Sequence, residues 1–325
     1  MVLTPLSRFN RRQIVGVAGE GHMTQRSVLQ TTYPVPVGDL SLPLESDTRS
    51  GGSMRFPAAA GASLEASRTG SLIINADDWG RDRENTERTR ECALRGAISS
   101  VSAMVFMEDS ERAAAMARES GIDSGLHLNF TTPFTAPNCS RHLAERQQRI
   151  ASYLRQHALA RAIFHPGLAG AFEYVVTAQL EEYGRLYGRQ PRRVDGHHHM
   201  HLCANVLLGG LLPRGTIVRR NFSFRRGEKS WSNRLYRNGV DRILERRHRL
   251  TDYFFSLPPL QPPSRVEEIF SLASDFAVEV ETHPINAEEY RFLTEDEIYR
   301  SAGDVSIARG FALAQPPSMG QRGNS

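Results

Sequence analysis

Short apolar segments that each end in polar side chains are the feature that most constrains the fold of this chain. Six segments are predicted as strands: Leu72–Ile74, Ser102–Phe106, Ser124–Asn129, Arg193–Gly196, Gly215–Val218 and Ala277–Glu281. Helical patterns separate several of them, and this alternation predicts parallel βαβ units. Because parallel sheets and barrels build active sites at the carboxyl ends of their strands, the polar clusters are predicted to meet at one edge.

The predicted helices alternate with these strands and cover residues 83–95, 110–119, 140–162 and 172–188. Gly96 and Gly121 follow the first two, where a glycine commonly ends a helix. The predicted fold class is therefore α/β, with one (β/α) barrel-like catalytic domain.

The expected catalytic domain covers residues 71–300. Residues 1–70 are rich in Gly, Ser, Pro and Thr and poor in large apolar side chains. Such a segment cannot bury enough surface to offset its ordering entropy, so a disordered extension is expected there. Residues 301–325 are expected to form a helix and a tail that is partly disordered.

The composition narrows the class of protein. At 40% hydrophobic and 23% charged residues, the chain has the composition of a globular protein. No run approaches the roughly 20 apolar residues that span a bilayer, which argues against a membrane-embedded enzyme. Three widely spaced cysteines, Cys92, Cys139 and Cys203, argue against a disulfide scaffold, and no signal-peptide core is present. A cytoplasmic location is expected.

The carboxylate pair Asp77-Asp78 directly follows the first predicted strand. Adjacent carboxylates repel each other, so a partly buried pair is costly unless a cation neutralises it. At a strand end the two side chains point to different sides, so one can bind a metal while the other faces substrate. The plainer alternative is a helix N-cap followed by an acid in the first turn.

A histidine cluster, His197-His-His-Met-His201, follows Asp195. Neutral imidazole is the commonest ligand for divalent transition metals, which predicts a metal site in this segment. The alternative is a histidine-rich tract that binds metal adventitiously. His127 and His283 are weaker signals alone, but both arrive at the same predicted edge. One carboxylate and two imidazoles describe a catalytic metal centre with open positions.

The order of these motifs resembles the YdjC-like carbohydrate deacetylases, a family that includes the chitooligosaccharide deacetylases. The resemblance spans roughly residues 71–295 and rests on Asn75–Gly80, Gly125–Asn129, Tyr187–Pro191, Val194–His201 and His283-Pro284.

The resemblance implies a barrel-like fold, one divalent metal ion, usually described as magnesium, and removal of an N-acetyl group from an amino sugar. It implies that Asp78, His127 and His197 are the metal ligands and that Asp77 is the general base. Two imidazoles are soft ligands for Mg²⁺, so ligand chemistry alone favours zinc or another transition ion.

The remaining candidates receive supporting roles. His283 is predicted to be the acid that protonates the leaving amine, with His199 or His201 in reserve. Either reserve histidine could instead orient a metal ligand, and Asp195 is expected to fix the tautomer of a nearby histidine. Asn129 is assigned to substrate binding or to the orientation of a ligand.

A basic stretch gives rise to other hypotheses. From Arg214 to Leu250 the chain has 12 basic and 3 acidic residues, interleaved with Phe222 and Phe224. A non-enzymatic nucleic-acid or anion binder could use this mixture, although a solvated helix face is the favoured interpretation. In a narrower hypothesis, Arg219 at the end of a predicted strand binds an anionic carbohydrate.

The other enzymatic hypothesis is a metal-dependent phosphoesterase on a related barrel, which would need ligands for two or three metal ions. The expected partner is an N-acetylated carbohydrate, in one variant an anionic one. Neither a membrane nor nucleic acid is the expected partner, and a homodimer is left open.

Overall fold

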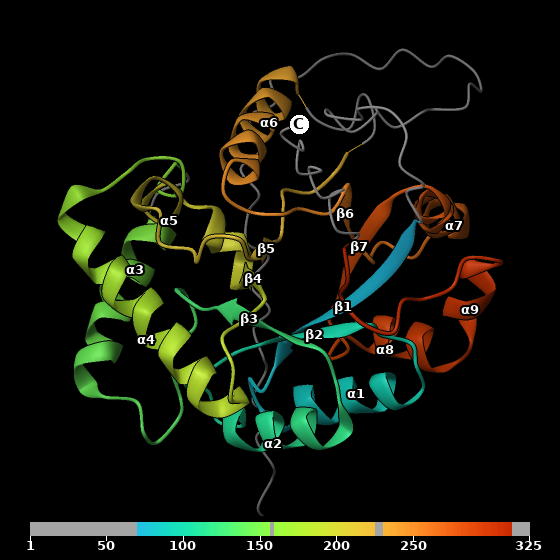
Figure 1. The fold of residues 1–325 in the computed structure, drawn as a ribbon, viewed down its shortest axis with the longest axis horizontal. Coiled ribbons are helices and arrows are strands. Elements are labelled where there is room, and N and C mark those ends of the chain that lie inside the picture. The colour runs from blue at the N-terminus through green and yellow to red at the C-terminus, as the bar shows by residue number, and fades with distance from the viewer. Residues whose placement is uncertain (1–69, 157–158, 225–229, 314–325) are drawn as a thin grey trace, which may run out of the picture. The chain divides into compact units, whose positions relative to one another are not determined.

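A computed structural model describes residues 70–156, 159–224 and 230–313 of the chain. Its centre is a parallel sheet of seven strands in the order β5-β4-β3-β2-β1-β7-β6 (Figure 1). The strands are β1 (Ser71–Trp79), β2 (Ser100–Ala103), β3 (Ser124–Leu128), β4 (Arg193–Gly196), β5 (Ile217–Val218), β6 (Tyr253–Ser256) and β7 (Ala277–Thr282). The predicted parallel α/β class is confirmed.

The first strand lies in the interior of the sheet, between β2 and β7, and its sequence suits burial on both faces. Leu72, Ile73 and Ile74 have no exposed surface, and such continuous apolar runs are typical of parallel strands covered by helices on both sides. β1 pairs with β2 along one side and with β7 along the other.

The pairing of β1 with β7 brings the last strand beside the first, as in a barrel. The sheet does not close into a complete barrel, however, because β5 and β6 are its two edge strands. The fold is therefore a barrel-like sheet that is open between β5 and β6. This opening lies on the side of Figure 1 where α6 (Trp231–Glu245) is drawn.

The other helices lie around the sheet, with α3 and α4 beside β3 and β4, and α8 near β1 (Figure 1). They are α1 (Arg83–Leu94), α2 (Ser110–Ser120), α3 (Arg141–Gln156), α4 (Ala169–Tyr187), α5 (Ala204–Gly209), α7 (Pro263–Ser271), α8 (Ala287–Thr294) and α9 (Glu297–Ala302). Gly121 adopts the left-handed conformation, with φ 67°, and ends α2 as predicted. Among the described helices, none combines the length and the apolar character needed to cross a bilayer.

Some predicted boundaries are wrong for local reasons. The second strand was predicted at Ser102–Phe106 but lies at Ser100–Ala103, and Phe106 has a φ of 58° that a strand does not tolerate. β5 is shorter than its prediction because Gly215 turns the chain with a φ of 78°. β6, α5, α7 and α8 were not predicted as elements.

The two ends of the chain need separate description. The predicted disordered extension lies, except for Gly70, outside the described residues, as do residues 314–325. α9 crosses the predicted boundary at residue 300. Beyond it, Ile307 forms a bridge with Leu72, and the Ala308 amide donates to the Leu72 carbonyl at 2.8 Å. The described part of the C-terminal region therefore lies against β1.

Candidate metal centre

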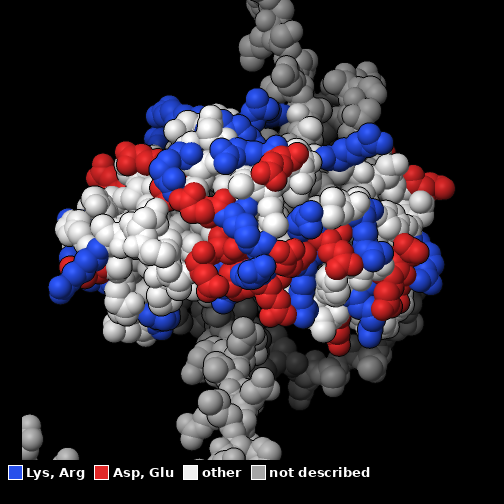
Figure 2. Space-filling view, turned by 90° about the horizontal axis from the view of Figure 1, so that it is seen from below, with Lys and Arg blue, Asp and Glu red and all other residues white. Residues whose placement is uncertain are grey.

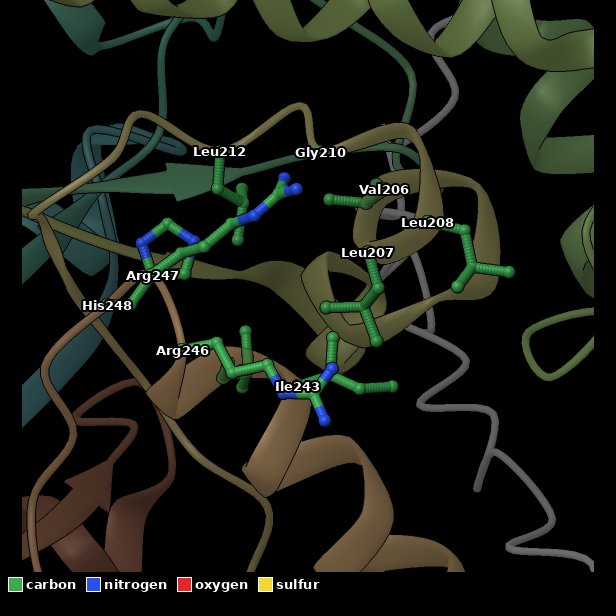
Figure 3. A pocket seen from close by; sticks show the side chains of 10 residues that line it. Val206, Leu207, Leu208, Gly210, Leu212, Ile243, Arg246, Arg247 and His248 are labelled. Atoms are coloured by element: carbon green, nitrogen blue, oxygen red, sulfur yellow. The ribbon is translucent and has the colours of Figure 1, made fainter.

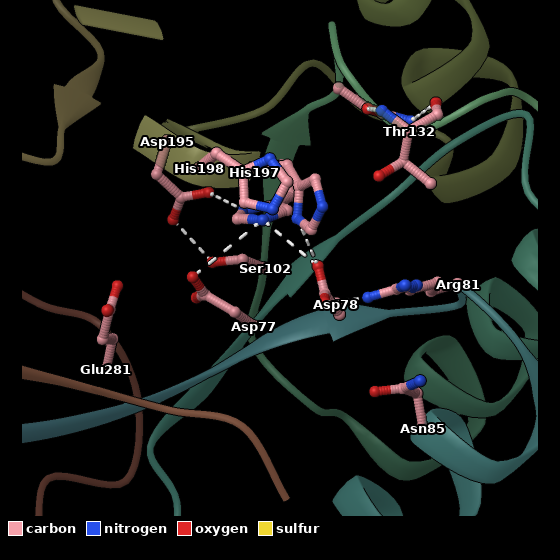
Figure 4. A network of polar contacts seen from close by, with 12 residues as sticks. Asp77, Asp78, Arg81, Asn85, Ser102, Thr132, Asp195, His197, His198 and Glu281 are labelled. Atoms are coloured by element: carbon pink, nitrogen blue, oxygen red, sulfur yellow. Dashed lines mark hydrogen bonds and ion pairs between the residues drawn. The ribbon is translucent and has the colours of Figure 1, made fainter. Parts of the chain in front are cut away.

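Three side chains predicted as metal ligands meet at the carboxyl ends of the strands. Asp78 comes from β1, His127 from β3, and His197 from the start of a 3-10 helix, η2 (His197–Leu202). The Asp78 Oδ1 atom lies 2.9 Å from His197 Nδ1 and 3.4 Å from His127 Nε2. Figure 4 shows Asp78 pointing toward the His197 ring.

The donor set fits a cation. One ligand atom from each residue lies within 4.8 Å of the others, and all three residues are buried. Asp78 Oδ1 and His127 Nε2 are buried with no hydrogen-bond partner in the described part of the chain. Such orphaned atoms are costly unless something satisfies them, and a divalent metal ion would satisfy both.

Asp195 orients His127 toward this centre. Its Oδ1 atom lies 2.7 Å from His127 Nδ1, which leaves Nε2 turned to Asp78. A carboxylate behind a ligating imidazole fixes the ring and its tautomer. Arg193 and Ser102 hold the other oxygen of Asp195, at 2.9 and 2.5 Å. Asp195 thus contacts a nearby histidine, as the orienting role predicted for it requires.

The backbone explains why neighbouring residues point in different directions. Asp78 has a φ of 63°, and the register between β1 and β2 shifts across this position. Aspartate tolerates the left-handed region better than most residues. Asp78 therefore turns toward the histidines and toward Arg81, whose Nη1 donates to Oδ2 at 2.9 Å. Asp77 turns the other way.

Two left-handed residues separate the histidines of the cluster. His198 and His199 have φ values of 55° and 57°. His197 consequently faces Asp78, whereas the partly exposed His199 lies with Nε2 3.7 Å from Glu281 Oε1. His201 is fully buried, and its Nε2 lies 2.9 Å from the Arg219 carbonyl oxygen.

Protonation must change when a metal binds. Burial lowers the pKa of His127, but Asp77, Asp195 and Asp78 outweigh it and raise that pKa to about 10. Burial raises the pKa of Asp78, yet His197 and His127 hold it well below the usual value. A ligating imidazole must be neutral at the bonding nitrogen, so metal uptake by this cluster would release a proton from His127.

Arg219 forms two hydrogen bonds with Asp77, the predicted general base. Its Nη1 and Nη2 atoms donate to the two oxygens of Asp77 at 2.7 and 2.8 Å. Burial raises the pKa of Asp77, but Arg219 and His127 lower it below the ordinary value. Asp77 is therefore ionised at neutral pH, and its Oδ2 lies 4.0 Å from His127 Nε2.

The guanidinium of Arg219 is enclosed by further carboxylates. It donates to Glu279 at 2.7 Å and to Glu281 at 3.2 Å, and it lies 3.3 Å from Asp195. Its side chain has no exposed surface. The hypothesis that Arg219 binds an anionic carbohydrate is not supported by this placement, because its donors face carboxylates of the protein itself.

The cluster holds more acidic than basic side chains. Among the described residues, two buried guanidinium groups, of Arg193 and Arg219, stand against five buried carboxylates: Asp77, Asp78, Asp195, Glu279 and Glu281. Burial and Asp77 raise the pKa of Glu281 to about 8. Burial also raises the pKa of Glu279 above its ordinary value.

Sequence reasoning did not select Glu279 and Glu281. The signal was present in the Val-Glu-Val-Glu run of β7, where two acids two residues apart share one face of a buried strand. Arg81, Arg193 and the exposed His198 were missed as well. His198 packs on His197 with ring centroids 3.9 Å apart, and its Nδ1 lies 2.9 Å from Thr131 Oγ1.

Two predicted residues lie outside the cluster of three ligands. Asn129 is fully buried and accepts from the Thr131 and Thr132 amides, so it shapes the loop after β3. His283 follows β7, and its amide donates to Glu289 at 2.8 Å. Burial lowers the pKa of His283, but Asp77, Glu281 and Asp78 raise it above the usual value.

A separate hollow of about 320 Å³ lies between α5 and the end of α6. Figure 3 shows its apolar floor and the basic side chains of Arg246, Arg247 and His248, with no carboxylate among the lining residues. It contains none of the predicted site residues.

The basic stretch is partly neutralised within the protein. Arg219 is paired as described, and Arg220 donates to Asp241 at 2.9 and 3.2 Å. Arg225 and Arg226 lie outside the described residues. Figure 2 shows acidic and basic side chains interspersed on the face where α1 and α2 lie. These pairings weaken the hypothesis of a nucleic-acid binder built on this stretch.

The protein is thus an α/β protein with a candidate metal site, formed by one carboxylate and two imidazoles at the C-terminal ends of its parallel strands. The family model of YdjC-like proteins matches residues 71–300, and the chain belongs to this family.

Two curated relatives are similar over part of their length. A carbohydrate deacetylase of Mus musculus is 32% identical over 143 residues, which are 42% of this chain and 44% of the relative. A chitooligosaccharide deacetylase of Enterobacter sp. is 30% identical over 136 residues, which are 42% of this chain and 52% of the relative. The matched part thus spans about half the length of these relatives.

A solved structure shares the fold. It is that of an Enterococcus faecalis protein provisionally named for cellobiose-phosphate cleavage, with a TM-score of 0.55 and 19% identity. The match covers 74% of this chain and 97% of that one. At this identity the likeness concerns the fold alone.

Proposed function

We propose that the chain is a metal-dependent hydrolase that removes the acetyl group from an N-acetylated amino sugar. One observation carries the proposal: an ionised carboxylate, Asp77, lies directly beside the three-residue cluster of Asp78, His127 and His197. A base next to a metal site is what amide hydrolysis by water requires. Membership of a family with relatives named as carbohydrate deacetylases supplies the substrate class.

The chemistry divides between the metal and the protein. A divalent ion held by Asp78, His127 and His197 would lower the pKa of bound water and polarise the acetamide carbonyl. Asp77 accepts the proton of the attacking water, and the two hydrogen bonds from Arg219 keep its carboxylate in place. His127 keeps its orientation through Asp195.

His283 is the proposed acid for the leaving amine. The carboxylates of Asp77 and Glu281 raise its pKa above the usual value, which favours the protonated form that an acid requires. In the overall reaction the amide C–N bond breaks, the acetyl carbon gains the water oxygen, and the amine nitrogen gains a proton from the acid. Asp77 would thus accept a proton from the water, and His283 would donate a proton to the amine.

Acetate release tests the proposal. The substrates are N-acetylglucosamine and its β-1,4-linked oligomers, with and without chelator, followed by re-addition of Mg²⁺ or Zn²⁺. We expect release that chelator abolishes and a metal restores. Zn²⁺ or another transition ion should restore more than Mg²⁺ if the imidazoles dominate the affinity. Release that is unaffected by chelator would contradict a metal-dependent reaction.

The phosphoesterase hypothesis predicts more metal ions. A second set of residues, Asp77, His127 and Asp195, could hold an ion, but it shares His127 with the first set. Its two carboxylates are also paired with Arg219 and Arg193. The described residues therefore favour one ion per chain. Elemental analysis that finds two or three ions, together with phosphate release, would favour the phosphoesterase.

A further inference from the structure

An aromatic stack leads from the candidate site to the surface. Phe254 on β6 is fully buried and lies beneath Arg219, with the guanidinium carbon 4.8 Å from the ring centroid. Phe222, in the segment after β5, stacks on Phe254 with centroids 4.5 Å apart and an angle of 12° between the rings. The three side chains form a column whose inner end holds Asp77 through Arg219.

The outer end of this column is partly exposed. Phe222 is partly accessible, whereas Phe254 has no exposed surface. His199 meets Phe222 edge to face at 4.7 Å, and it is also partly exposed. A rigid aromatic ring and an imidazole therefore stand together beside the buried charge cluster.

The plain alternative is that Phe222 belongs to the hydrophobic core. A core phenylalanine would be enclosed as Phe254 is, and Phe222 is not. The neighbouring Phe224 is also only partly buried, with a ring centroid 6.4 Å from that of Phe222. Two partly exposed aromatic rings thus follow each other along the segment that leaves the candidate site.

We propose that Phe222 and His199 form a binding subsite for the pyranose ring next to the N-acetylated sugar that reacts. This proposal rests on the proposed function and deepens it by making the substrate an oligosaccharide. The apolar C–H face of a pyranose packs on an aromatic ring, while its hydroxyl groups need polar partners at the rim. His199 supplies such a partner next to Phe222.

The position of the subsite follows from shared contacts. Arg219 contacts both Asp77 and Phe254, so the aromatic column and the proposed base are fixed by the same side chain. A sugar whose acetamide reaches Asp77 would leave its neighbour in the chain near Phe222. The subsite should therefore act on oligomers and not on the monomer.

Binding to an inactive variant tests the subsite. Asp77→Asn in its metal-loaded form is titrated calorimetrically with N-acetylglucosamine and with its β-1,4-linked dimer and trimer. Adding Phe222→Ala should weaken binding of the dimer and trimer about tenfold and leave the monomer unchanged, because only oligomers reach the ring. Phe222→Tyr should restore binding to within about threefold.

Two further variants serve as controls for lost packing and for the loss of an aromatic ring elsewhere. Phe222→Leu keeps apolar packing against Phe254 without the aromatic ring, and it should still weaken oligomer binding. Tyr174→Ala removes a partly exposed aromatic ring on α4 and should change nothing. Thermal melting of each variant shows whether the fold is kept.

The subsite is overturned if Phe222→Leu melts like the parent and binds dimer equally well, if monomer and dimer weaken alike, or if no oligomer binds. Failure of the proposed function would look different. Phe222-dependent binding of oligomers without acetate release by the wild-type protein would retain the subsite and reject the deacetylase. Acetate release that is unchanged by Phe222→Ala would retain the deacetylase and reject the subsite.

Discussion

Asp77 and Arg219, 142 positions apart in the chain, are joined by two parallel hydrogen bonds of 2.7 and 2.8 Å. The pair is fully enclosed, with exposed side-chain fractions of 3% and 0%. The same guanidinium also serves Glu279 and Glu281. One cation thus fixes the proposed base and neutralises part of the acidic cluster beneath the candidate metal centre.

Arg219→Met should destabilise the protein strongly. The substitution leaves Asp77 and its neighbouring carboxylates buried without their cation, and breaking a buried pair in this way costs about 3–5 kcal/mol. Urea unfolding at neutral pH measures the loss. Arg141→Met, in an exposed pair with Glu145, is the matched control and should cost less than about 1 kcal/mol. Equal losses for the two variants would contradict the enclosed role of Arg219.

Glu281→Gln should make stability less dependent on pH. The pKa of Glu281 is raised to about 8 by burial and Asp77, whereas its ordinary value is 4.5. Between these values the unfolded chain loses the proton and the folded protein keeps it. Wild-type stability therefore falls as the pH rises from about 4.5 to 8, at a limit of about 1.4 kcal/mol per unit.

The ionisable groups around Glu281 are Asp77, Arg219, Glu279, His199 and His283. Because glutamine cannot ionise, Glu281→Gln should gain stability relative to wild type up to about pH 8 and then stay level. Chemical denaturation from pH 5 to 9 measures the difference. Glu84→Gln on exposed α1 is the control, and parallel curves for wild type and Glu281→Gln would show that Glu281 ionises normally.

A divalent ion should raise the melting temperature of the wild-type protein. A ligand present at 100 times its dissociation constant adds about 2.7 kcal/mol to the stability of a folded state that alone binds it. His127→Ala should lose this effect, and His142→Ala on α3 should keep it. Elemental analysis should find one ion per wild-type chain. A full metal effect in His127→Ala would place the ion elsewhere.

Asp77→Asn should separate metal binding from turnover. Asparagine keeps the size of the side chain and an acceptor for Arg219 but cannot take a proton from water. We expect retention of the metal-induced rise in melting temperature and a loss of acetate release of about 10²- to 10⁴-fold. Near wild-type turnover in Asp77→Asn would assign the base to another group.

The meeting of the three proposed ligands could be predicted from the sequence because each lies at the end of an apolar strand or just after it, and parallel strands deliver their ends to one edge. The partners of those ligands could not. Which guanidinium reaches Asp77 depends on the sheet curving until β5 and β7 approach β1. The direction of each histidine depends on the left-handed turns at His198 and His199. Neither the long-range pairing nor the turns leave a pattern in the local sequence.

The opening between β5 and β6 has a consequence for substrate range. The described part of the chain between these edge strands is joined to them by a bridge between Arg249 and Ile217 and by the Ser223 amide, which donates to the Phe254 carbonyl. It can lengthen, shorten or exchange aromatic side chains such as Phe222 while β1, β3 and β4 keep their register. Under the proposed function, a fold with such a gap can change the oligosaccharides it accepts while the proposed metal ligands keep their positions.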